Sequence, residues 1–494
     1  MAEAVKKKKK RGMPTSFTIL FGCLVFVAIC TWIVSAFTPD VTGATLAQVL
    51  QAPFAGFKNA IDVCLFVIVL GGFLAIVNKT GALDAGIATL VRKLGNRDTL
   101  LIPVLMLAFG ICGSTYGMME ETIPFYILLA SVTFAMGFDS MVGALIVLLG
   151  AGLGTLGSTV NPFSIAIASS ALTDMGIAVN QGTLIAVGFL LFVISEGMGI
   201  FFVMRYAKRV KADRANSAMT PDELASMDAA YADETKAIEE EESASNLKDA
   251  VLTGKQKLVL VLFALSFIVM IISFIPWESF GINFFALGAT PDNPGTAWSA
   301  FLTGLPLGEW YFTECGIWFF VISIIIGLVG GLGEKELVNT FVDGCSTMIS
   351  TALVIAVARA ISVLMAETGL DVFVLEAAAT ALSGVSAVIF APASYALYFV
   401  LSFLIPSSSG MATVSMPIMG PLADSLGFSP DIMIMIYVAA HGVVAMITPT
   451  NGVIVSGLEL AHTSYTTFLK LTLKFFIALT VVTAAVLTVL MLVM

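Results

Sequence analysis

The chain has 494 residues, of which 58% are hydrophobic and only 12% are charged. A soluble domain of average composition carries about 25% charged residues, so this composition excludes most soluble enzymes, secreted proteins and nucleic-acid-binding proteins. The apolar runs are about twenty residues long, which suits helices that cross a bilayer. An outer-membrane barrel would show alternating segments of about ten residues instead. The sequence therefore predicts an all-α polytopic membrane protein.

The basic residues set the expected orientation of the chain. Residues 1–15 form a basic N-terminus, and further clusters of Lys and Arg fall at 79–97 and 205–257. Such clusters concentrate on the cytoplasmic side of membrane proteins. We therefore expect a cytoplasmic N-terminus in the inner membrane and nine crossings that leave the C-terminus outside. The expected single spans lie at about 16–37, 60–78, 256–275, 315–333 and 347–366.

Composition shifts divide the chain into five parts. The acidic, Ala- and Ser-rich stretch in the middle of the chain is expected to be a solvated cytoplasmic connector, partly helical. The parts are the basic N-terminus (1–15), a first transport repeat (16–204), a charged linker (205–255), an extra transmembrane helix with an external loop (256–314), and a second, inverted transport repeat (315–494).

Two stretches without Lys or Arg, 98–204 and 360–469, resemble each other. In each, a glycine at the end of a small polar motif precedes a proline by seven residues, and a Gly-Phe pair begins 24 residues before an asparagine. An odd number of membrane spans lies between the two stretches, so the second stretch has the opposite orientation in the membrane. We therefore expect two inverted-topology repeats, a plan shared by many secondary transporters. The matched pairs are Gly117–Pro124 with Gly410–Pro417, and Gly137–Asn161 with Gly427–Asn451.

Each repeat contains a short apolar run, a polar tip and a second short run. The second runs are too short to cross a bilayer comfortably, because a span needs about 20 residues. They predict one re-entrant hairpin per repeat, with two ordinary helices and a polar turn as the alternative. The first hairpin comprises Leu101 to Cys112, Gly113 to Gly117 and Thr122 to Met136, and the second comprises Val388 to Ile405, Pro406 to Gly410 and Met411 to Leu426.

Helix-breaking and short polar residues follow each hairpin. Residues 157–162 read Gly-Ser-Thr-Val-Asn-Pro, and residues 448–452 read Thr-Pro-Thr-Asn-Gly. Proline and glycine interrupt helices, and unwound backbone survives at membrane depth only where protein or a cavity surrounds it. The pattern predicts one broken transmembrane helix per repeat, whose half-helix ends bind charged groups. A packing kink is the alternative for each break.

These segments also carry a family resemblance. Residues 117–124, 157–163 and 447–452 resemble the YfcC-type carriers, which are grouped with the anaerobic C4-dicarboxylate carriers in the ion transporter superfamily. The resemblance covers nearly the whole chain and implies elevator-type alternating access and, by family analogy, a homodimer. Relatives divide between basic amino-acid antiporters of the arginine/ornithine type and carriers named for dicarboxylates. Dicarboxylate carriers usually show Ser-Asn-Thr at the breaks, and both breaks here depart from that order.

Acidic residues bear on the substrate. Glu120 and Glu121 follow the first tip, and Glu196 lies in the next long helix. A carboxylate inside the membrane is a functional candidate by default, so we expect Glu120 or Glu121 to bind a cationic group, a proton or Na⁺. A carboxylate at the rim of a water-filled cavity is the alternative. Glu196 is equally compatible with close helix packing. His441 is expected to be a satisfied buried histidine rather than a proton carrier.

Arg359 is the basic residue within the expected span at 347–366. We expect it to pair with a scaffold acid such as Asp343 or Glu367. Contact with a substrate carboxylate is the alternative, and it would favour a dicarboxylate.

The leading hypothesis is a basic amino-acid antiporter, whose substrate carboxylate meets the helix breaks and whose cationic side chain meets Glu120 or Glu121. The alternative is a Na⁺- or H⁺-coupled carboxylate or C4-dicarboxylate carrier. An enzyme is not expected, because no nucleophile–base pair or cofactor motif is visible. The expected partners are a small-molecule substrate and the lipid bilayer, without nucleic acid.

The candidate site residues follow from the tips and the breaks. No cofactor is expected beyond Na⁺ or H⁺ as a coupling ion, and the Na⁺ candidates are Ser158, Asn161, Thr448 and Asn451. The predicted substrate-binding residues are Ser114, Thr115, Glu120, Glu121, Ser158, Thr159, Asn161, Ser408, Ser409, Thr448, Thr450 and Asn451.

Overall fold

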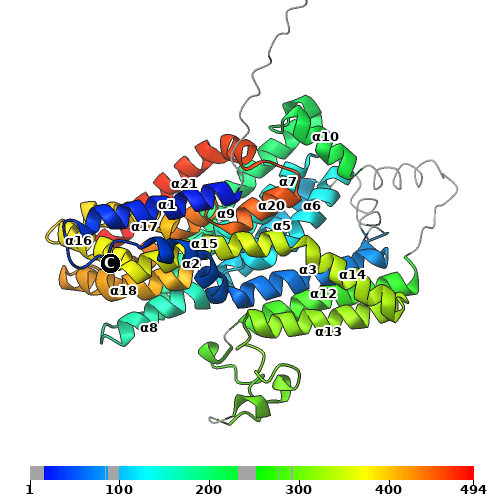
Figure 1. Ribbon diagram of the computed structural model, residues 1–494, viewed down its shortest axis with the longest axis horizontal. Helices are drawn as coiled ribbons and strands as arrows, with labels where there is room; N and C mark the ends of the chain where they lie inside the picture. The colour runs from blue at the N-terminus through cyan, green and yellow to red at the C-terminus, as the bar shows by residue number, and fades with distance from the viewer. Residues whose placement is uncertain are drawn as a thin grey trace, which may run out of the picture.

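The computed structural model is a bundle of α-helices (Figure 1). It describes residues 16–83, 85, 86, 89, 99–231, 252–275, 277–290 and 293–494. Among these residues, seven helices are long and apolar enough to cross a membrane, and none forms a β-strand. The predicted all-α membrane class is confirmed. The basic N-terminus (1–15) and the acidic run Glu239 to Glu242 lie outside the described residues.

The helices form two series with a similar order of lengths. Several begin at a side-chain cap; the carboxylate of Asp139, for example, accepts a hydrogen bond from the backbone N–H of Val142 at 3.1 Å. The first series is α1 (Ser16–Ser35), α2 (Leu46–Asn59), α3 (Ile61–Lys79), α5 (Leu101–Tyr116), α6 (Ile123–Ala135), α7 (Ser140–Leu156), α8 (Ile167–Thr173) and α9 (Gln181–Ala212). The second series is α13 (Phe312–Gly330), α14 (Glu334–Thr347), α15 (Ile349–Thr368), α16 (Leu370–Leu382), α17 (Ala387–Leu404), α18 (Ser408–Ser425), α19 (Pro430–Ala445), α20 (Gly452–Leu460) and α21 (Tyr465–Val493).

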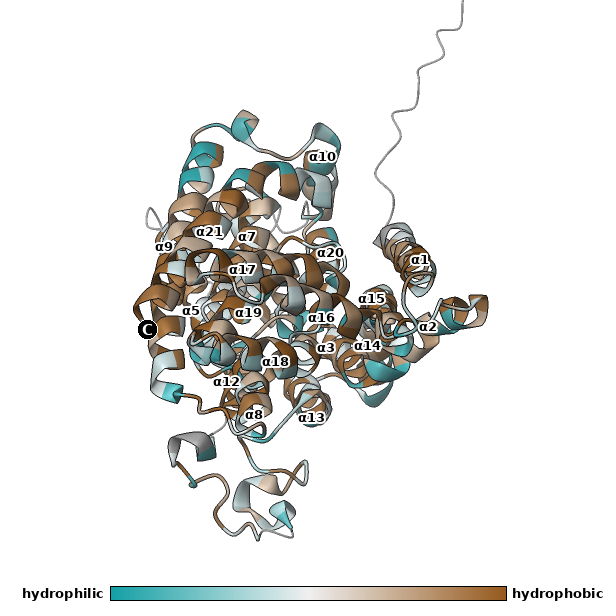
Figure 2. Ribbon diagram, turned by 90° about the vertical axis from the view of Figure 1, so that its left-hand side faces the viewer, coloured by the Kyte–Doolittle hydropathy of each residue, from teal (hydrophilic) through white to brown (hydrophobic). Residues whose placement is uncertain are grey.

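The helices divide into two packing groups. In Figure 2, α1, α2, α14 and α15 lie to one side of the bundle that contains α7, α9, α17 and α19. The outer group also includes α3, α13 and the connecting helix α12 (Gly254–Phe274), which packs on α13. The contacts within this group follow the same pattern in both series. Helices α1 and α2 of the first series pack on α15 of the second, and α13 and α14 of the second series pack on α3 of the first. We call this group the scaffold and the bundle the core.

Two largely apolar helices, α7 and α19, form the centre of the core. All of α7 and nearly all of α19 are buried, as expected of helices that are hydrophobic all round. Their C-terminal ends meet antiparallel: Gly152 faces Met446, and Gly442 faces Leu156. A β-carbon at Gly442 would lie 2.5 Å from the Cα of Leu156, so only glycine permits this approach. The chain breaks that follow both helices are therefore held side by side.

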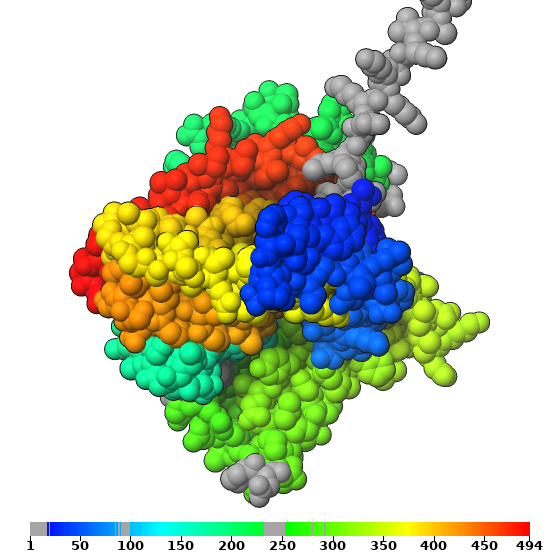
Figure 3. Space-filling model, turned by 60° about the vertical axis from the view of Figure 1, so that its left-hand side comes forward, coloured from blue at the N-terminus to red at the C-terminus, as the bar shows by residue number. Residues whose placement is uncertain are grey.

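Each predicted hairpin region forms two helices joined by a short tip, which fits both a re-entrant hairpin and the alternative of two ordinary helices with a polar turn. Helix α5 continues to Tyr116, so Ser114 and Thr115 lie in its last turn and not in the tip. The first tip begins at Gly117, whose φ of +78° favours glycine, and a 3₁₀ turn, η2 (Glu120–Thr122), leads into α6. The second tip spans residues 405–407, between α17 and α18. Figure 3 shows α18 lying on the segment that contains α8, so each hairpin covers elements of the other repeat.

Part of the linker is folded, whereas the sequence indicated a solvated connector. Helix α10 (Pro221–Ala230) packs on the core. Met227 accepts a hydrogen bond from the backbone N–H of Ser140, and Glu223 accepts hydrogen bonds from the backbone N–H of Ser464 at 2.8 Å and from the hydroxyl of Thr467 at 3.0 Å. The linker thus joins the start of α7 to the start of α21.

Removing the Glu223 carboxylate tests this contact. Burial acts to raise the pKa of Glu223, but hydrogen bonds from Ser464 and Thr220 outweigh it and hold the pKa below its usual value. The contact is therefore fully present above the ordinary glutamate pKa and is lost as pH falls through the lowered value. We expect E223Q to speed hydrogen exchange of α10 at neutral pH, and the difference from wild type to disappear as the pH falls through the lowered pKa of Glu223. The exposed neighbour Asp222 supplies the control D222N; equal exchange in all three proteins would contradict the docking.

Candidate functional site

A cavity of about 320 Å³ lies where the two hairpin tips and the two helix breaks meet. Its size suits a small molecule. The scaffold contributes Arg359 from α15 and the pair Tyr311–Phe312 at the start of α13. The core supplies the remaining walls: Gly117, Met119, Glu120, Glu121, Thr155, Asn161, Phe163, Ile167, Pro406 to Ser409, His441, Ala445 and Asn451.

Polar side chains in the first break form hydrogen bonds within the break itself. Asn161 caps the half-helix that follows, because its Oδ1 accepts a hydrogen bond from the backbone N–H of Phe163 at 2.9 Å. Its amide nitrogen donates to the hydroxyl of Ser158 at 3.1 Å. The hydroxyl of Ser114, on the hairpin arm α5, donates to the carbonyl of Gly157 at 2.7 Å. The hairpin thereby satisfies a carbonyl that the broken helix leaves open.

The second break repeats this arrangement with different residues. Oδ1 of Asn451 accepts a hydrogen bond from the backbone N–H of Val453 at 3.0 Å, and its amide nitrogen donates to the carbonyl of Ala445 at 2.9 Å. The hydroxyl of Thr450 donates to the carbonyl of Phe403 on the hairpin arm α17 at 3.0 Å. Both half-helices that follow the breaks, Pro162–Thr173 and α20, therefore begin with an asparagine cap at the cavity wall.

Not all predicted site residues reach the cavity. Glu120, Glu121, Asn161, Ser408, Ser409 and Asn451 line it, and Thr450 lines a small adjoining pocket together with Glu120 and Arg359. Five others do not line either pocket in this structure, because their hydroxyls form hydrogen bonds within the hairpins and breaks; substrate binding at these five stays a prediction. These five are Ser114, Thr115, Ser158, Thr159 and Thr448.

Arg359 is placed differently from the sequence expectation. No ion pair joins it to Asp343 or Glu367 within the described residues. Its side chain lines both pockets beside Glu120. The sequence could have indicated a role for Arg359 in the site, because a basic residue inside a transmembrane helix is a functional candidate. The cavity therefore contains charged groups of both signs.

The carboxylates differ in their surroundings. Glu121 is buried, and its Oε2 accepts a hydrogen bond from the backbone N–H of Met119 at 3.1 Å. Glu120 is half-buried and faces the same space as Arg359. His441 has a hydrogen-bond partner in Ser402 at 3.2 Å and also contributes to the wall.

The sodium candidates fall into two groups, Ser158 with Asn161 and Thr448 with Asn451, one in each break. Both asparagine Oδ1 atoms are engaged in the caps described above. No group of three or more His, Cys, Asp or Glu residues suited to a metal ion occurs in the part of the chain that was searched. Sodium binding at these residues stays a prediction.

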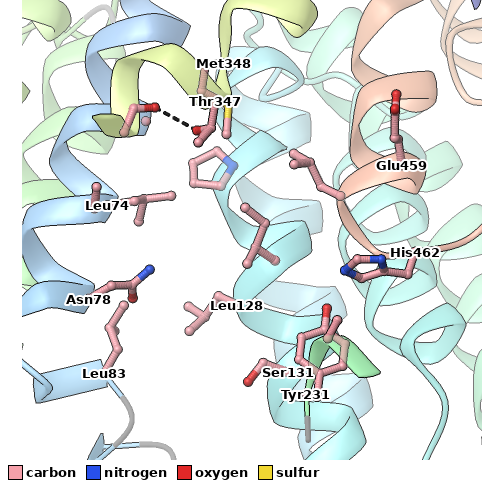
Figure 4. Close-up of a pocket in the computed structure, with 17 residues that line it drawn as sticks. Leu74, Asn78, Leu83, Leu128, Ser131, Tyr231, Thr347, Met348, Glu459 and His462 are labelled. Atoms are coloured by element: carbon pink, nitrogen blue, oxygen red, sulfur yellow. Dashed lines mark hydrogen bonds between the residues drawn. The ribbon is translucent and has the colours of Figure 1, made fainter. Parts of the chain in front are cut away.

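A second cavity, of about 530 Å³, lies between the scaffold and the core (Figure 4). Leu74 and Asn78 of α3 face Leu128 of α6 across it, with Glu459 and His462 from the second repeat at one side. Pro124 lines this second cavity, and Glu121 lines the first cavity. The start of α6, which is the second arm of the first hairpin, therefore separates the two cavities. We call this second cavity the vestibule.

Comparisons with known proteins match the whole chain. The profile of the DcuC family, described as C4-dicarboxylate anaerobic carriers, matches residues 42–492. An uncharacterized protein of Haemophilus influenzae is 27% identical, over 92% of this chain and 92% of its own length. YfcC of Escherichia coli K12, whose name proposes a basic amino acid antiporter, is 24% identical, over 87% of this chain and 78% of its own length.

Two solved transporters were also matched. YdaH of Alcanivorax borkumensis, described as having an unusual topology, gives a TM-score of 0.45 at 16% identity and covers 96% of this chain and 98% of its own. MtrF of Neisseria gonorrhoeae, described with a class of antimetabolite efflux pumps, gives a TM-score of 0.43 at 17% identity and covers 98% of this chain and 96% of its own.

The protein is a multi-pass secondary transporter rather than an enzyme. The chain belongs to the C4-dicarboxylate anaerobic carrier (DcuC) family, because the family profile covers nearly all of it.

The first tip offers a test of the cavity wall. A β-carbon at Gly117 would lie 2.5 Å from the amide nitrogen of Asn161, so G117A must displace that side chain. Gly137 has a similar φ of +81° with nothing within 4 Å, which makes G137A a control for backbone strain alone. Both variants should lose stability by about 1 kcal/mol. Only G117A should also weaken substrate binding, measured by titration of the purified protein. Equal substrate affinity in both variants would show that Asn161 does not take part in substrate binding.

Proposed function

We propose that this transporter is a basic amino-acid antiporter of the cytoplasmic membrane. One observation carries the proposal: Glu120, Glu121 and Arg359 line a single cavity between the two helix breaks. An amino acid carries a carboxylate and an ammonium group, and this cavity presents partners for both.

The charge balance favours a substrate with a net charge of about +1. Two carboxylates and one guanidinium give the ionised cavity a formal excess of one negative charge. A buried charge without compensation is costly. Arginine or ornithine would neutralise this excess, whereas a dicarboxylate would add two further negative charges to it.

The same residues suggest how the substrate is oriented. The guanidinium of Arg359 suits bidentate binding of an α-carboxylate. The half-helix α20 and its asparagine cap add N-terminal backbone dipoles on the same side, where Thr450 and Asn451 adjoin Arg359. The ammonium or guanidinium groups of the substrate would then lie toward Glu120 and Glu121.

The two packing groups support elevator-type movement in this proposal. Arg359 belongs to the scaffold, and Glu120 belongs to the core. The vestibule lies between these two groups, where it would receive the substrate after the core has moved. Exchange would follow if the core moves readily only when the cavity is occupied.

A sodium- or proton-coupled C4-dicarboxylate carrier is the second candidate. The family description and the placement of Arg359 in the cavity favour it. It requires the two carboxylates to be neutralised, by protons or by a coupling cation, before a dianion can enter.

The substrate class is tested by removing one carboxylate at a time. Glu120→Gln keeps the size and hydrogen-bonding capacity of the side chain but deletes its charge. A charge-assisted hydrogen bond contributes about 1.5–3 kcal/mol, so arginine or ornithine affinity should fall roughly ten- to a hundredfold. The exposed Glu367 at the end of α15 supplies the control E367Q, which should bind like wild type. Saturable succinate binding without arginine or ornithine binding in the wild type would contradict the proposal.

Orientation in the membrane is a separate prediction. The basic clusters put α10 in the cytoplasm and the loop before α13 outside. In a background without the six native cysteines, D222C and N293C should react with a membrane-impermeant thiol reagent from opposite sides of the membrane. Reaction from the same side would overturn the predicted topology and the inverted orientation of the repeats.

A further inference from the structure

Glu196 is a buried acid that the proposed substrate site does not use. It lies in the middle of α9, its side chain is 1% exposed, and it lines neither the substrate cavity nor the vestibule. Neither carboxyl oxygen has a hydrogen-bond partner in the structure. A buried polar group without a partner is rare in folded proteins and calls for an explanation.

The packing around Glu196 leaves room for the acid but offers it no donor. A β-carbon at Gly110 of α5 would lie 3.0 Å from its Oε2, so the absence of a side chain there accommodates the carboxyl group. The ring of Phe192 lies beside the same glycine. The neighbouring hydroxyl of Ser195 donates instead to the carbonyls of Leu153 and Phe192, both at 3.2 Å.

No charged partner stabilises an ionised Glu196. The elements packed against α9 are α5, α7, α19, α21 and the turn after α9, and none of their groups forms a hydrogen bond or an ion pair with Glu196 within the described residues. Asp431 accepts a hydrogen bond from Asn180, and Arg214 pairs with Asp228. The titratable or charged groups on these elements are Cys112 and Tyr116 on α5, Asp431, Tyr437 and His441 on α19, Tyr465, Lys470 and Lys474 on α21, and Arg214 in the turn; α7 has none.

An isolated carboxylate ion in these surroundings would be very costly, so the form that fits this conformation is the neutral acid. We propose that Glu196 is a proton-binding site of the transport cycle, protonated while the α5–α9 seam is closed and deprotonated when water enters that seam. The proposal rests on the protein being a transporter and not on the choice of substrate.

Close contacts at glycines link the surroundings of Glu196 to the substrate cavity. A β-carbon at Gly154 of α7 would lie 2.1 Å from the carbonyl oxygen of Gly110 of α5, and the residue after Gly154, Thr155, is part of the cavity wall. Because Gly110 also lies against Glu196, a movement of α5 would reach both the acid and the cavity wall.

Helix α9 also supports the first break directly. Gly157 lies against the backbone of Phe192, and Gly188 lies against the carbonyl of Ser158. A movement of the break during transport is therefore transmitted to the helix that carries Glu196.

The proposed step is a simple proton transfer. The O–H bond of the neutral acid breaks, the proton passes to a water molecule to give hydronium, and the electron pair remains on the carboxylate. The reverse step restores the acid by taking up a proton from water on the opposite side of the membrane. One proton therefore crosses in each complete transport cycle.

Proton movement is measured with the full-length protein in liposomes that contain a pH-sensitive dye. Arginine is used as the driving substrate in one arm and succinate in the other. We expect substrate entry to change the internal pH for the wild type. E196Q should still move radiolabelled substrate but without the pH change, because glutamine mimics the neutral acid and cannot release a proton. Ser195→Ala, the adjacent neutral variant, should behave like wild type.

A direct readout keeps the test independent of the substrate. The infrared carbonyl band of a protonated carboxylic acid should be present in the wild type at neutral pH and reduced in E196Q. If E196Q does not fold, E196D retains an acid in a shifted position and should alter the pH dependence of proton movement. The proposal is overturned if the wild type shows no such band attributable to Glu196, if substrate moves without proton movement in the wild type, if E196Q retains the proton signal, or if E196D leaves its pH dependence unchanged.

Discussion

An unwound peptide segment inside a membrane protein must find its hydrogen bonds within the protein, because no water is available in the hydrocarbon core to replace them. This constraint organises the structure. Each break exchanges a hydrogen bond with the hairpin arm of its own repeat. In the first repeat, Ser114 of the arm donates to the carbonyl of Gly157 in the break; in the second, Thr450 of the break donates to the carbonyl of Phe403 in the arm. A hairpin and a break therefore form one unit, and neither is expected to be stable at membrane depth without the other.

The approach of α7 and α19 then brings the two units together. Glycines at positions 152 and 442 let their C-terminal ends overlap, so both breaks begin near the same point. Asn161 and Asn451 cap the half-helices on the far sides. The cavity is the space left between these polar elements, and its charges come from residues beside the tips and from the scaffold.

The division of charge between scaffold and core has a mechanistic consequence. Glu120 lies beside the first tip in the core, whereas Arg359 lies on α15 of the scaffold. A substrate that contacts both residues would keep the contact between its carboxylate and Arg359 only while the core stays in one position. In the proposed elevator cycle, separation from Arg359 would weaken binding as the core moves toward the vestibule.

The sequence predicted the backbone elements more completely than the positions of the side chains. The breaks and hairpins could be predicted because Gly, Pro and Asn act locally on the chain, as at Gly157 to Pro162. Amphipathic helices such as α2 and α14 were missed because they are too polar to stand out as spans. Whether a hydroxyl faces the cavity or its own backbone depends on helix rotation, which spacing alone does not give. Spacing therefore could not show that Ser114 and Thr448 hydrogen-bond within the hairpin and the break, nor that Arg359 lines the same cavity as Glu120, which lies far away in sequence.

The central claim is that the substrate lies between the two breaks and touches both charged sides of the cavity. A cryo-EM structure of the protein in lipid nanodiscs with saturating arginine tests it most directly. The account predicts ligand density bounded by Asn161 and Asn451, with its carboxylate at Arg359 and its cationic end at Glu120 or Glu121. Density confined to the vestibule, with the cavity between the breaks occupied only by water, would contradict it.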